Sequence, residues 1–195
     1  IWIGNQSGLY FFHAATRELS PYPIGGHDNQ KYDIRSLLLD GDHLWIGTYA
    51  KGIRVVNLRT GAVKVYTHSR GIPYTICSND VLCFYRGRNG EIYVGTSWGL
   101  CRYDAAKDNF MPIINIGSMI SITDMHEDMY NHLWIATSSS GVFTYNTING
   151  HYKNYQHERE DSTTITSNSI ITLFEDVKGT MWFGTNGGGL CSFDA

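Results

Sequence analysis

Two aromatic residues of this 195-residue sequence, Tyr49 and Trp98, stand in segments where related segments carry small or polar residues. A flat aromatic ring can stack on the apolar side of a sugar, while amide and basic groups hydrogen-bond its hydroxyl or acidic groups. The candidate ligand-binding residues, all expected in loops, are Tyr49, Lys51, Arg70, Tyr74, Trp98 and Asn186. Ser139, Asn79 and Asn168 are expected on the same face.

The same segments support a catalytic site less well than they support a sugar-binding surface. Gly95-Thr96-Ser97-Trp98-Gly99 matches the G-x-S-x-G pattern of a nucleophile elbow, but that motif needs a strand, a sharp turn and a helix. Here it lies between two predicted strands. A glycan-active enzyme would need paired carboxylates about 5–10 Å apart. The candidates Asp33, Asp80, Asp124 and Glu127 are not grouped by their spacing, so we expect no catalytic residue and no enzyme activity in this chain.

Histidine and cysteine spacing gives no metal signature. The eight histidines show no H-x-x-x-H pair, and the four cysteines show no C-x-x-C pair. We therefore predict no metal and no cofactor. Cys77, Cys83, Cys101 and Cys191 are expected to be small, buried apolar residues. His43 and His132 each stand directly before a Leu-Trp pair, which indicates a structural role.

Composition excludes several functional classes. There are 15 Lys and Arg against 18 Asp and Glu, a net charge of −3, which gives no support to nucleic-acid or membrane-surface binding. The apolar fraction of 42% excludes a disordered chain, and no apolar run is long enough for a transmembrane helix. Both ends, at Ile1 and Ala195, are expected to be cut from a longer protein.

A repeated aromatic segment positions these residues. Five copies occur, at Ile1-Trp2-Ile3-Gly4, Leu44-Trp45-Ile46-Gly47-Thr48, Ile92-Tyr93-Val94-Gly95-Thr96, Leu133-Trp134-Ile135-Ala136-Thr137 and Met181-Trp182-Phe183-Gly184-Thr185. The central aromatics are separated by 41 to 48 residues. Self-similarity at this period indicates a solenoid, a propeller or an array. The tryptophans are expected to pack where neighbouring units meet.

Each aromatic segment is accompanied by other short alternating blocks. A block beginning with Gly follows it, another precedes it in four units, and a further one follows at 63–66, 109–113 and 151–155. Turn residues such as Asp40-Gly41 and Asn149-Gly150 separate the blocks. Asp176-Val177-Lys178-Gly179 is similar to the Asp-box turn of sialidase propellers, with one extra residue, and is expected to be structural.

Four antiparallel strands per unit of about 45 residues are typical of a β-propeller blade. We predict an all-β, partial β-propeller with three whole blades and two partial ones, in one domain spanning residues 1–195. The repeat units are approximately 1–30, 31–75, 76–116, 117–164 and 165–195. In this architecture the loop between the second and third strands opens on the same face as the loop entering the innermost strand.

The repeat resembles a known family. Its last copy runs from Ser167-Asn168-Ser169-Ile170 through Asp176-Val177-Lys178-Gly179-Thr180-Met181-Trp182-Phe183-Gly184-Thr185 to Gly189-Leu190-Cys191-Ser192-Phe193-Asp194. This unit is similar to the two-component regulator propeller repeat, which builds the periplasmic sensor region of Bacteroides-type hybrid two-component systems. Tyr93 in place of Trp and Ala136 in place of Gly are modest departures. The resemblance extends over essentially the whole chain.

The resemblance implies an extracytoplasmic ligand sensor, detecting an oligosaccharide and signalling to a cytoplasmic histidine kinase and DNA-binding regulator that this chain lacks. It implies a periplasmic location in an inner-membrane protein. The expected partners are an oligosaccharide, a second copy of the sensor region and the remaining blades, with no contact to nucleic acid or membrane. Two alternatives remain open: a protein-interaction or dimerisation scaffold, and a glycan-active propeller lyase or glycosidase.

Overall fold

Strands are the regular elements of the computed structural model, which describes residues 1–25, 31–113 and 120–193. They form five antiparallel sheets in chain order. The first contains β1 (Trp2–Asn5), β2 (Gly8–His13) and β3 (Glu18–Tyr22). The second contains β4 (Ile34–Asp40), β5 (His43–Thr48), β6 (Ile53–Asn57) and β7 (Val63–Tyr66). No helix long and apolar enough to cross a membrane occurs within these described ranges.

The remaining three sheets continue the pattern. The third contains β8 (Val81–Arg86), β9 (Ile92–Thr96), β10 (Gly99–Asp104) and β11 (Asn109–Pro112). The fourth contains β12 (Ile122–Glu127), β13 (His132–Thr137), β14 (Val142–Asn146) and β15 (Tyr152–Tyr155). The fifth contains β16 (Ile170–Glu175), β17 (Met181–Thr185) and β18 (Leu190–Phe193).

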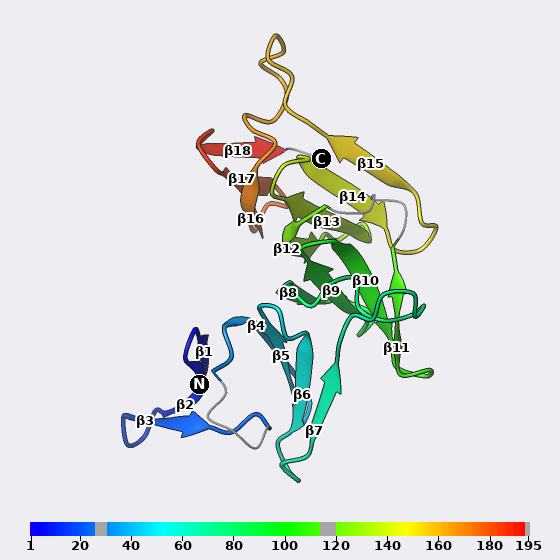
Figure 1. Cartoon of the computed structure of the whole chain (residues 1–195). Coiled ribbons are helices and arrows are strands. Elements are labelled where there is room, and N and C mark those ends of the chain that lie inside the picture. Colours follow the sequence, from blue (N-terminus) through cyan, green and yellow to red (C-terminus); the bar gives the residue numbers. More distant parts are fainter. Residues whose placement is uncertain (26–30, 114–119, 194–195) are drawn as a thin grey trace.

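The sheets follow one another around an open arc (Figure 1). The innermost strands β4, β8, β12 and β16 contact their neighbours in succession, and β1 contacts β4. Each innermost strand carries a register shift near its start, for example between Val81 and Cys83 in β8. Three four-stranded sheets between two three-stranded sheets confirm the predicted partial propeller. Strand β3 is the one outer strand that the sequence pattern missed.

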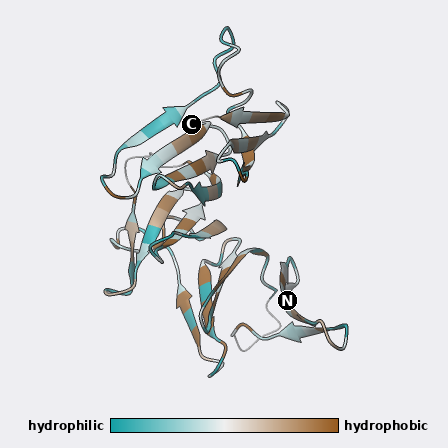
Figure 2. Ribbon diagram, turned by 180° about the vertical axis from the view of Figure 1, so that it is seen from behind, coloured by the Kyte–Doolittle hydropathy of each residue, from teal (hydrophilic) through white to brown (hydrophobic). Residues whose placement is uncertain are grey.

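Apolar side chains fill the spaces between successive sheets. One cluster joins Trp45 and Ile53 of the second sheet to Val81, Val94 and Phe110 of the third. Each fully buried large apolar side chain contributes about 1.5–3 kcal/mol to folding. In Figure 2 the apolar colours gather on inner and middle strands, whereas the outer strand β15 is hydrophilic. The blades are therefore held together face to face by side chains rather than by shared strand pairing.

The glycine of the aromatic segment marks a close approach between blades. A Cβ added at Gly47 would lie 2.7 Å from a methyl group of Val81 in the next blade. At Gly95 it would lie 2.5 Å from Cys83 Sγ and 2.8 Å from a methyl group of Ile122. Neither distance is compatible with a side chain unless the neighbour moves. The recurring glycine of the repeat therefore has a packing reason at these two blades.

Burial of the repeat tryptophans follows their place in the arc. Trp45 and Trp134 are buried, with 4% and 3% of their surface exposed, as the packing prediction requires. Trp2 and Trp182, in the two three-stranded end sheets, are half-buried. Trp45 stacks on Tyr66 of its own blade and meets Tyr103 of the next blade edge-on at 4.8 Å.

Candidate functional site

Two kinds of loop lie at the same end of their blades, and we call the surface that they form the loop face. It consists of the segments between the second and third strands, together with the described parts of the segments that enter the innermost strands. Four backbone hydrogen bonds of 2.8–3.0 Å join these two sets of segments within blades: Tyr49 to Asp33, Ser97 to Asp80, Ser138 to Ser121, and Asn186 to Ser169. The two kinds of loop therefore lie on the same end of each blade.

A threonine closes the loop between the second and third strands in each of the last four blades. The hydroxyl of Thr48 donates to the carbonyl of Gly52 at 2.7 Å, across four residues. The equivalent pairs are Thr96 with Gly99, Thr137 with Gly141, and Thr185 with Gly189. Because the donor and acceptor lie at the two strand ends, the loop between them is fixed at its base.

Asparagines in the entry segments join neighbouring blades. The carbonyl of Asn79 accepts the backbone N–H of Gly52, and its side-chain Oδ1 accepts the backbone N–H of His68 at 2.7 Å. Asn168 makes the same two contacts, with Gly141 and His157. The two asparagines were expected on the same face as the ligand-binding candidates, and their side-chain oxygens hold the loop.

A histidine completes each of these entry segments. Nδ1 of His68 lies 2.8 Å from the carbonyl of Ile76, and Nδ1 of His157 lies 2.8 Å from the carbonyl of Ile165. Because a carbonyl can only accept, the ring nitrogen is the donor in both. The sequence indicates this repeated arrangement. The two histidines are 89 residues apart, and so are the two asparagines. The same offset separates Trp45 from Trp134.

Tyr49 and Trp98 are exposed on the loop face, as predicted. Tyr49 has 52% of its surface exposed, with the Arg35 guanidinium 5.4 Å from its ring centre. Trp98 has 54% exposed and its ring lies 6.3 Å from that of His68. Each aromatic side chain is thus available to solvent, beside a cationic or imidazole group.

Lys51 is more constrained than the sequence suggested. Its ammonium group donates to the carbonyl of Lys31 at 3.1 Å and lies 4.8 Å from the ring centre of Tyr32. The guanidinium of Arg54 lies over the same buried ring at 4.1 Å and donates to the Tyr32 hydroxyl. Lys51 therefore borders a basic and aromatic cluster at the entry to the second blade.

The other predicted residues are exposed but separate. Arg70 and Asn186 have exposed side chains, and Tyr74 is 53% exposed with a left-handed φ of 64°. The carbonyl of Tyr74 accepts the backbone N–H of Phe110, which ties its segment to β11. No interaction found among the described residues joins the side chains of two of the six candidates. Their role in binding a ligand stays a prediction.

The four candidate catalytic carboxylates hold backbone and side-chain partners in place. Asp33 pairs with Arg35 at 2.8 Å, and Asp80 accepts the backbone N–H of Ala50 at 2.7 Å. Asp124 accepts from the hydroxyl of Thr172 and the backbone N–H of Leu173 in the next blade. The fourth, Glu127, accepts the backbone N–H of Arg88 at 2.7 Å. Each of the four carboxylates therefore makes an ion pair or hydrogen bonds that stabilise the structure around it.

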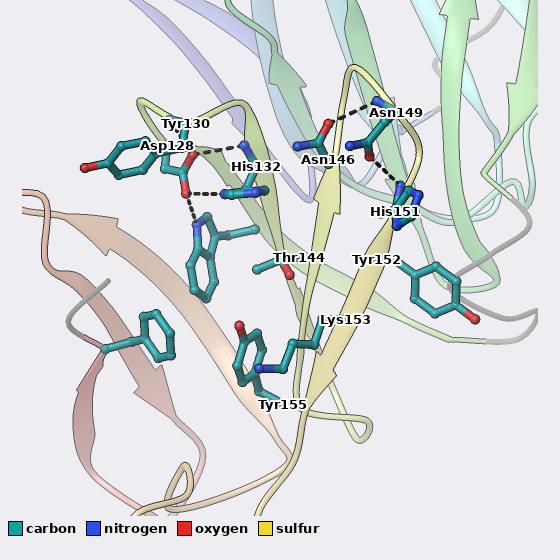
Figure 3. A pocket seen from close by; sticks show the side chains of 12 residues that line it. Asp128, Tyr130, His132, Thr144, Asn146, Asn149, His151, Tyr152, Lys153 and Tyr155 are labelled. Atoms are coloured by element: carbon teal, nitrogen blue, oxygen red, sulfur yellow. Dashed lines mark hydrogen bonds and ion pairs between the residues drawn. The ribbon is translucent and has the colours of Figure 1, made fainter.

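A hollow of about 390 Å³ lies on the outer part of the fourth blade, and we call it the outer hollow. Its lining residues are Asp128, Tyr130, His132, Trp134, Thr144, Asn146, Asn149, His151, Tyr152, Lys153, Tyr155 and Phe193. Figure 3 shows Asp128 turned toward His132, and Lys153 lying along Tyr155. None of these residues was among the ligand-binding candidates.

Asp128 organises the end of the outer hollow. It accepts hydrogen bonds from the backbone of Tyr130 and His132 and from the indole Nε1 of Trp134 at 2.8 Å. Burial by itself would raise the pKa of Asp128, but these donors outweigh it and lower the pKa. The carboxylate therefore stabilises the fold above pH 4 and loses this effect as the pH falls further. Asp176 repeats the arrangement with Trp182.

No group of three or more histidine, cysteine or acidic side chains that could hold a metal is found in residues 1–25, 31–113 and 120–193. The four cysteines are free thiols, with Cys83 and Cys101 buried and Cys77 and Cys191 half-buried. Cys101 and Cys77 pack in the same apolar cluster as Trp45.

Comparisons with known proteins agree with this architecture. A two component regulator propeller family model matches residues 164–187. A "Histidine kinase P4" of Formosa agariphila is 35% identical over 75 residues, covering 38% of this chain and 5% of the relative. The extracellular domain of a putative hybrid two component system from B. thetaiotaomicron superimposes with a TM-score of 0.81 at 25% identity, covering 97% of this chain and 24% of that domain. A second such domain gives a TM-score of 0.60 at 20% identity, covering all of this chain and 31% of the other.

The predicted resemblance is confirmed: the family model matches one repeat, at residues 164–187, and the fold is that of the extracellular domain of a hybrid two component system. The similarity to the first of these extracellular domains, at 25% identity, supports an extracytoplasmic location. The chain spans about a quarter of the length of the first of these domains and a twentieth of the histidine kinase.

Proposed function

We propose that this chain, an arc of two-component regulator propeller repeats, is part of a periplasmic ligand sensor in a hybrid two-component system. The sensor binds an oligosaccharide through the loop face and passes the signal to a cytoplasmic histidine kinase and transcription regulator. The blades carry out no reaction on the ligand. Coupling requires that the ligand bind two states of the sensor with different affinity.

The observation that carries this proposal is the rigid support of exposed aromatic rings on the loop face. Threonine hydroxyls fix the loop bases, and Asn79 connects the loop carrying Tyr49 to the next blade. Ordered loops on a rigid scaffold lose little conformational freedom on binding. Tyr49 and Trp98 present about half of their surface to solvent. Exposed rings with nearby cationic groups suit sugars that carry acidic or hydroxyl groups.

A thermal-shift screen of the chain against plant, host and microbial oligosaccharides tests the proposal, with product analysis of each sample. A sensor gives an upward shift of melting temperature with one class of sugar and leaves that sugar intact. Ligand at 100 times its Kd stabilises the protein by about 2.7 kcal/mol. Cleavage of the sugar would instead establish the lyase or glycosidase alternative.

Two matched variants locate the binding surface. Trp98→Ala removes an exposed ring of the loop face and should abolish the shift while leaving the melting temperature without sugar nearly unchanged. Tyr130→Ala removes a ring of similar exposure, 60%, from the turn between β12 and β13, away from the loop face. This variant should retain the shift. Equal loss in both variants, or in neither, contradicts binding at the loop face.

Self-association of the sensor region is a further part of the proposal. Exposed apolar residues on β16, including Ile171 and Phe174, offer a surface that a second copy could cover. Light scattering at increasing protein concentration measures the mass directly. A concentration-independent monomer with and without sugar would argue against dimerisation through these blades.

A further inference from the structure

The segment that enters the third blade is attached to that blade at two points. The carbonyl of Tyr74 accepts the backbone N–H of Phe110 in β11 at 2.9 Å. The hydroxyl of Ser78 lies 3.0 Å from that of Ser97, in the loop between β9 and β10. Strand β10 lies between these two attachments, because it pairs with β11 on one side and with β9 on the other. The residues between Tyr74 and Ser78 are therefore held against β10.

Cys77 lies in this short stretch and meets Cys101 of β10. The two side chains belong to the same apolar cluster, and their thiol groups interact directly as a side-chain hydrogen bond. Cys101 is fully buried and Cys77 is half-buried. The other two cysteines, Cys83 and Cys191, pack in two different clusters. Cys77 and Cys101 are thus the one pair of the four cysteines that shares a cluster, with side chains close enough to be joined.

The fifth blade has the matching position with one cysteine instead of two. Cys191 pairs with β17 as Cys101 pairs with β9, so the two residues are equivalent. Thr166 follows Ile165 at the place that Cys77 occupies after Ile76, again with an offset of 89 residues. The repeat itself therefore does not require a cysteine at either position, and the chain supplies its own control.

The two thiols of the pair differ in reactivity. The hydrogen bond with Cys101 lowers the pKa of Cys77, whereas burial raises the pKa of Cys101. The thiolate is the form that attacks a disulfide, so Cys77 is favoured as the attacking thiol. Cys77 also has an exposed part that an external reagent can reach, whereas the buried Cys101 has access to the sulfur of Cys77.

We propose that Cys77 and Cys101 form a disulfide bond when this chain is in an oxidising compartment. The inference rests on the periplasmic location in the proposed function, because disulfides persist in the periplasm and are rare in the cytosol. The oxidant is a protein or small-molecule disulfide. The bond joins the entry segment to the middle of the third sheet.

The reaction takes place in two exchange steps. The Cys77 thiolate attacks one sulfur of the external disulfide, which forms a mixed disulfide and releases one thiolate. The Cys101 thiol then gives its proton to a thiolate, and its sulfur attacks the sulfur of Cys77 and displaces the second thiolate. The two cysteines lose two electrons and two protons, and the external disulfide is reduced to two thiols.

The bond affects the loop face as well as stability. The segment that enters the third blade carries Arg70 and Tyr74, two of the candidate ligand-binding residues. A cross-link between residues 77 and 101 removes extended conformations from the unfolded chain, so it stabilises the folded state. In the folded state it holds the end of the entry segment on β10 by a covalent bond. The disulfide therefore keeps this part of the loop face in place.

Oxidation of the reduced, folded chain with oxidised glutathione tests the proposal. Peptide mapping by mass spectrometry should find a Cys77–Cys101 disulfide, while Cys83 and Cys191 join no other cysteine of the chain. The melting temperature should rise by about 5 °C or more, and dithiothreitol should reverse the rise. This measurement needs no sugar, so a failure of the disulfide is distinguished from a failure of the proposed sensor function.

Two serine variants provide the matched comparison. Cys77→Ser should abolish both the disulfide and the rise in melting temperature, whereas Cys191→Ser should keep both. Export of the unchanged chain to the periplasm of a Gram-negative host should give the same disulfide without added oxidant. The proposal would be overturned by reduced Cys77 and Cys101 after oxidation of the folded chain. A disulfide of either residue with Cys83 or Cys191, or an equal rise in Cys77→Ser, would also overturn it.

Discussion

The indole nitrogen of Trp134 donates a 2.8 Å hydrogen bond to Asp128, whereas the equivalent nitrogen of Trp45 is buried and has no acceptor among the described residues. The difference follows from turn length. Asp128 stands six residues before Trp134, whereas Asp40, at the same point of the shorter hairpin, stands five residues before Trp45 and pairs with Arg86 at 2.9 Å. The shorter turn at Asp40-Gly41 therefore removes the acceptor while the ring keeps its packing.

This difference predicts that two similar substitutions lower the free energy of unfolding by different amounts. Trp134→Phe removes a hydrogen bond to a carboxylate, and Trp45→Phe removes a buried N–H that has no described acceptor. Both lose a comparable amount of buried ring. We expect Trp134→Phe to lower the free energy of unfolding by about 1–3 kcal/mol more than Trp45→Phe does. Urea unfolding followed by circular dichroism measures both, and equal losses would show that the hydrogen bond to Asp128 contributes little.

Asp108, in the turn between β10 and β11, joins the third blade to the second. It accepts hydrogen bonds from the hydroxyls of Tyr66 and Tyr103 and pairs with the ammonium group of Lys64, and we call this contact the Asp108 lock. The lock predicts a dependence of stability on pH. The ammonium of Lys64 and the hydroxyls of Tyr66 and Tyr103 lower the pKa of Asp108 to about 2. An unfolded aspartate titrates near pH 4, so the ionised carboxylate stabilises the fold above that pH and loses the effect as the pH falls toward 2. Solvent screens this partly exposed group, so Asp108→Asn should lower the melting temperature at pH 7 by only a few degrees.

Melting curves of Asp108→Asn and the unchanged chain from pH 7 to pH 2 provide the test. The difference between them should shrink as Asp108 becomes protonated. We also expect the stability of the chain to fall at alkaline pH. Burial is the largest cause that raises the pKa of Tyr66 to about 12, and the hydrogen bond to Asp108 is the next largest. Stability from the neutral phenol is complete below pH 10 and is lost as the pH rises toward 12. A constant difference across the acidic range would contradict the lock.

The entry-segment asparagines should have equivalent effects in two blades. Asn79→Ala removes the acceptor of the His68 backbone N–H, and Asn168→Ala does the same for His157. Each change should cost about 0.5–1.5 kcal/mol of stability and loosen the segment between the histidine and the asparagine. Hydrogen exchange measured by mass spectrometry should speed up in residues 68–79 in the first variant and 157–168 in the second. Unchanged exchange in both segments would contradict this structural role of the two asparagines.

The cysteines should differ in reactivity. Burial raises the pKa of Cys83 and of Cys101, which disfavours the reactive thiolate. Ellman's reagent should therefore modify these two thiols only as fast as the protein unfolds, and mass spectrometry of the products should find label first at Cys77 or Cys191. Rapid labelling of Cys83 in the folded chain would contradict its burial between the third and fourth blades.

Much of the fold was predictable because the repeat is local. The recurring Trp-Ile-Gly-Thr segments, the alternation of apolar residues and the Asp-Gly and Asn-Gly turns are short-range patterns, and each specifies one hairpin. A period near 45 residues then restricts how such hairpins can assemble. Strand β3 escaped prediction because Glu18–Tyr22 is largely exposed and carries Pro21, so the apolar alternation of the other strands is missing.

The loop face was predicted in outline, and its exposed rings, Tyr49 and Trp98, lie where the pattern placed them. The structural roles of Asn79 and Asn168 were not recognised, although their spacing of 89 residues, shared with His68 and His157, carried the signal. A hydrogen-bonding side chain on a loop has the same sequence pattern whether it faces a ligand or its own backbone. Only the folded structure distinguishes the two.

The sequence by itself determined the blades, their order and their turns, because these depend on residues a few positions apart. The tertiary structure alone decided which groups meet across blades, such as Asp108 with Lys64 and Asp124 with Leu173, and it left the indole N–H of Trp45 without an acceptor among the described residues. The residues of each pair are 40 to 50 positions apart in the chain, and the surroundings of the Trp45 N–H depend on the length of the neighbouring turn. Their contacts follow from the rotation between successive sheets, a long-range quantity that no short pattern encodes.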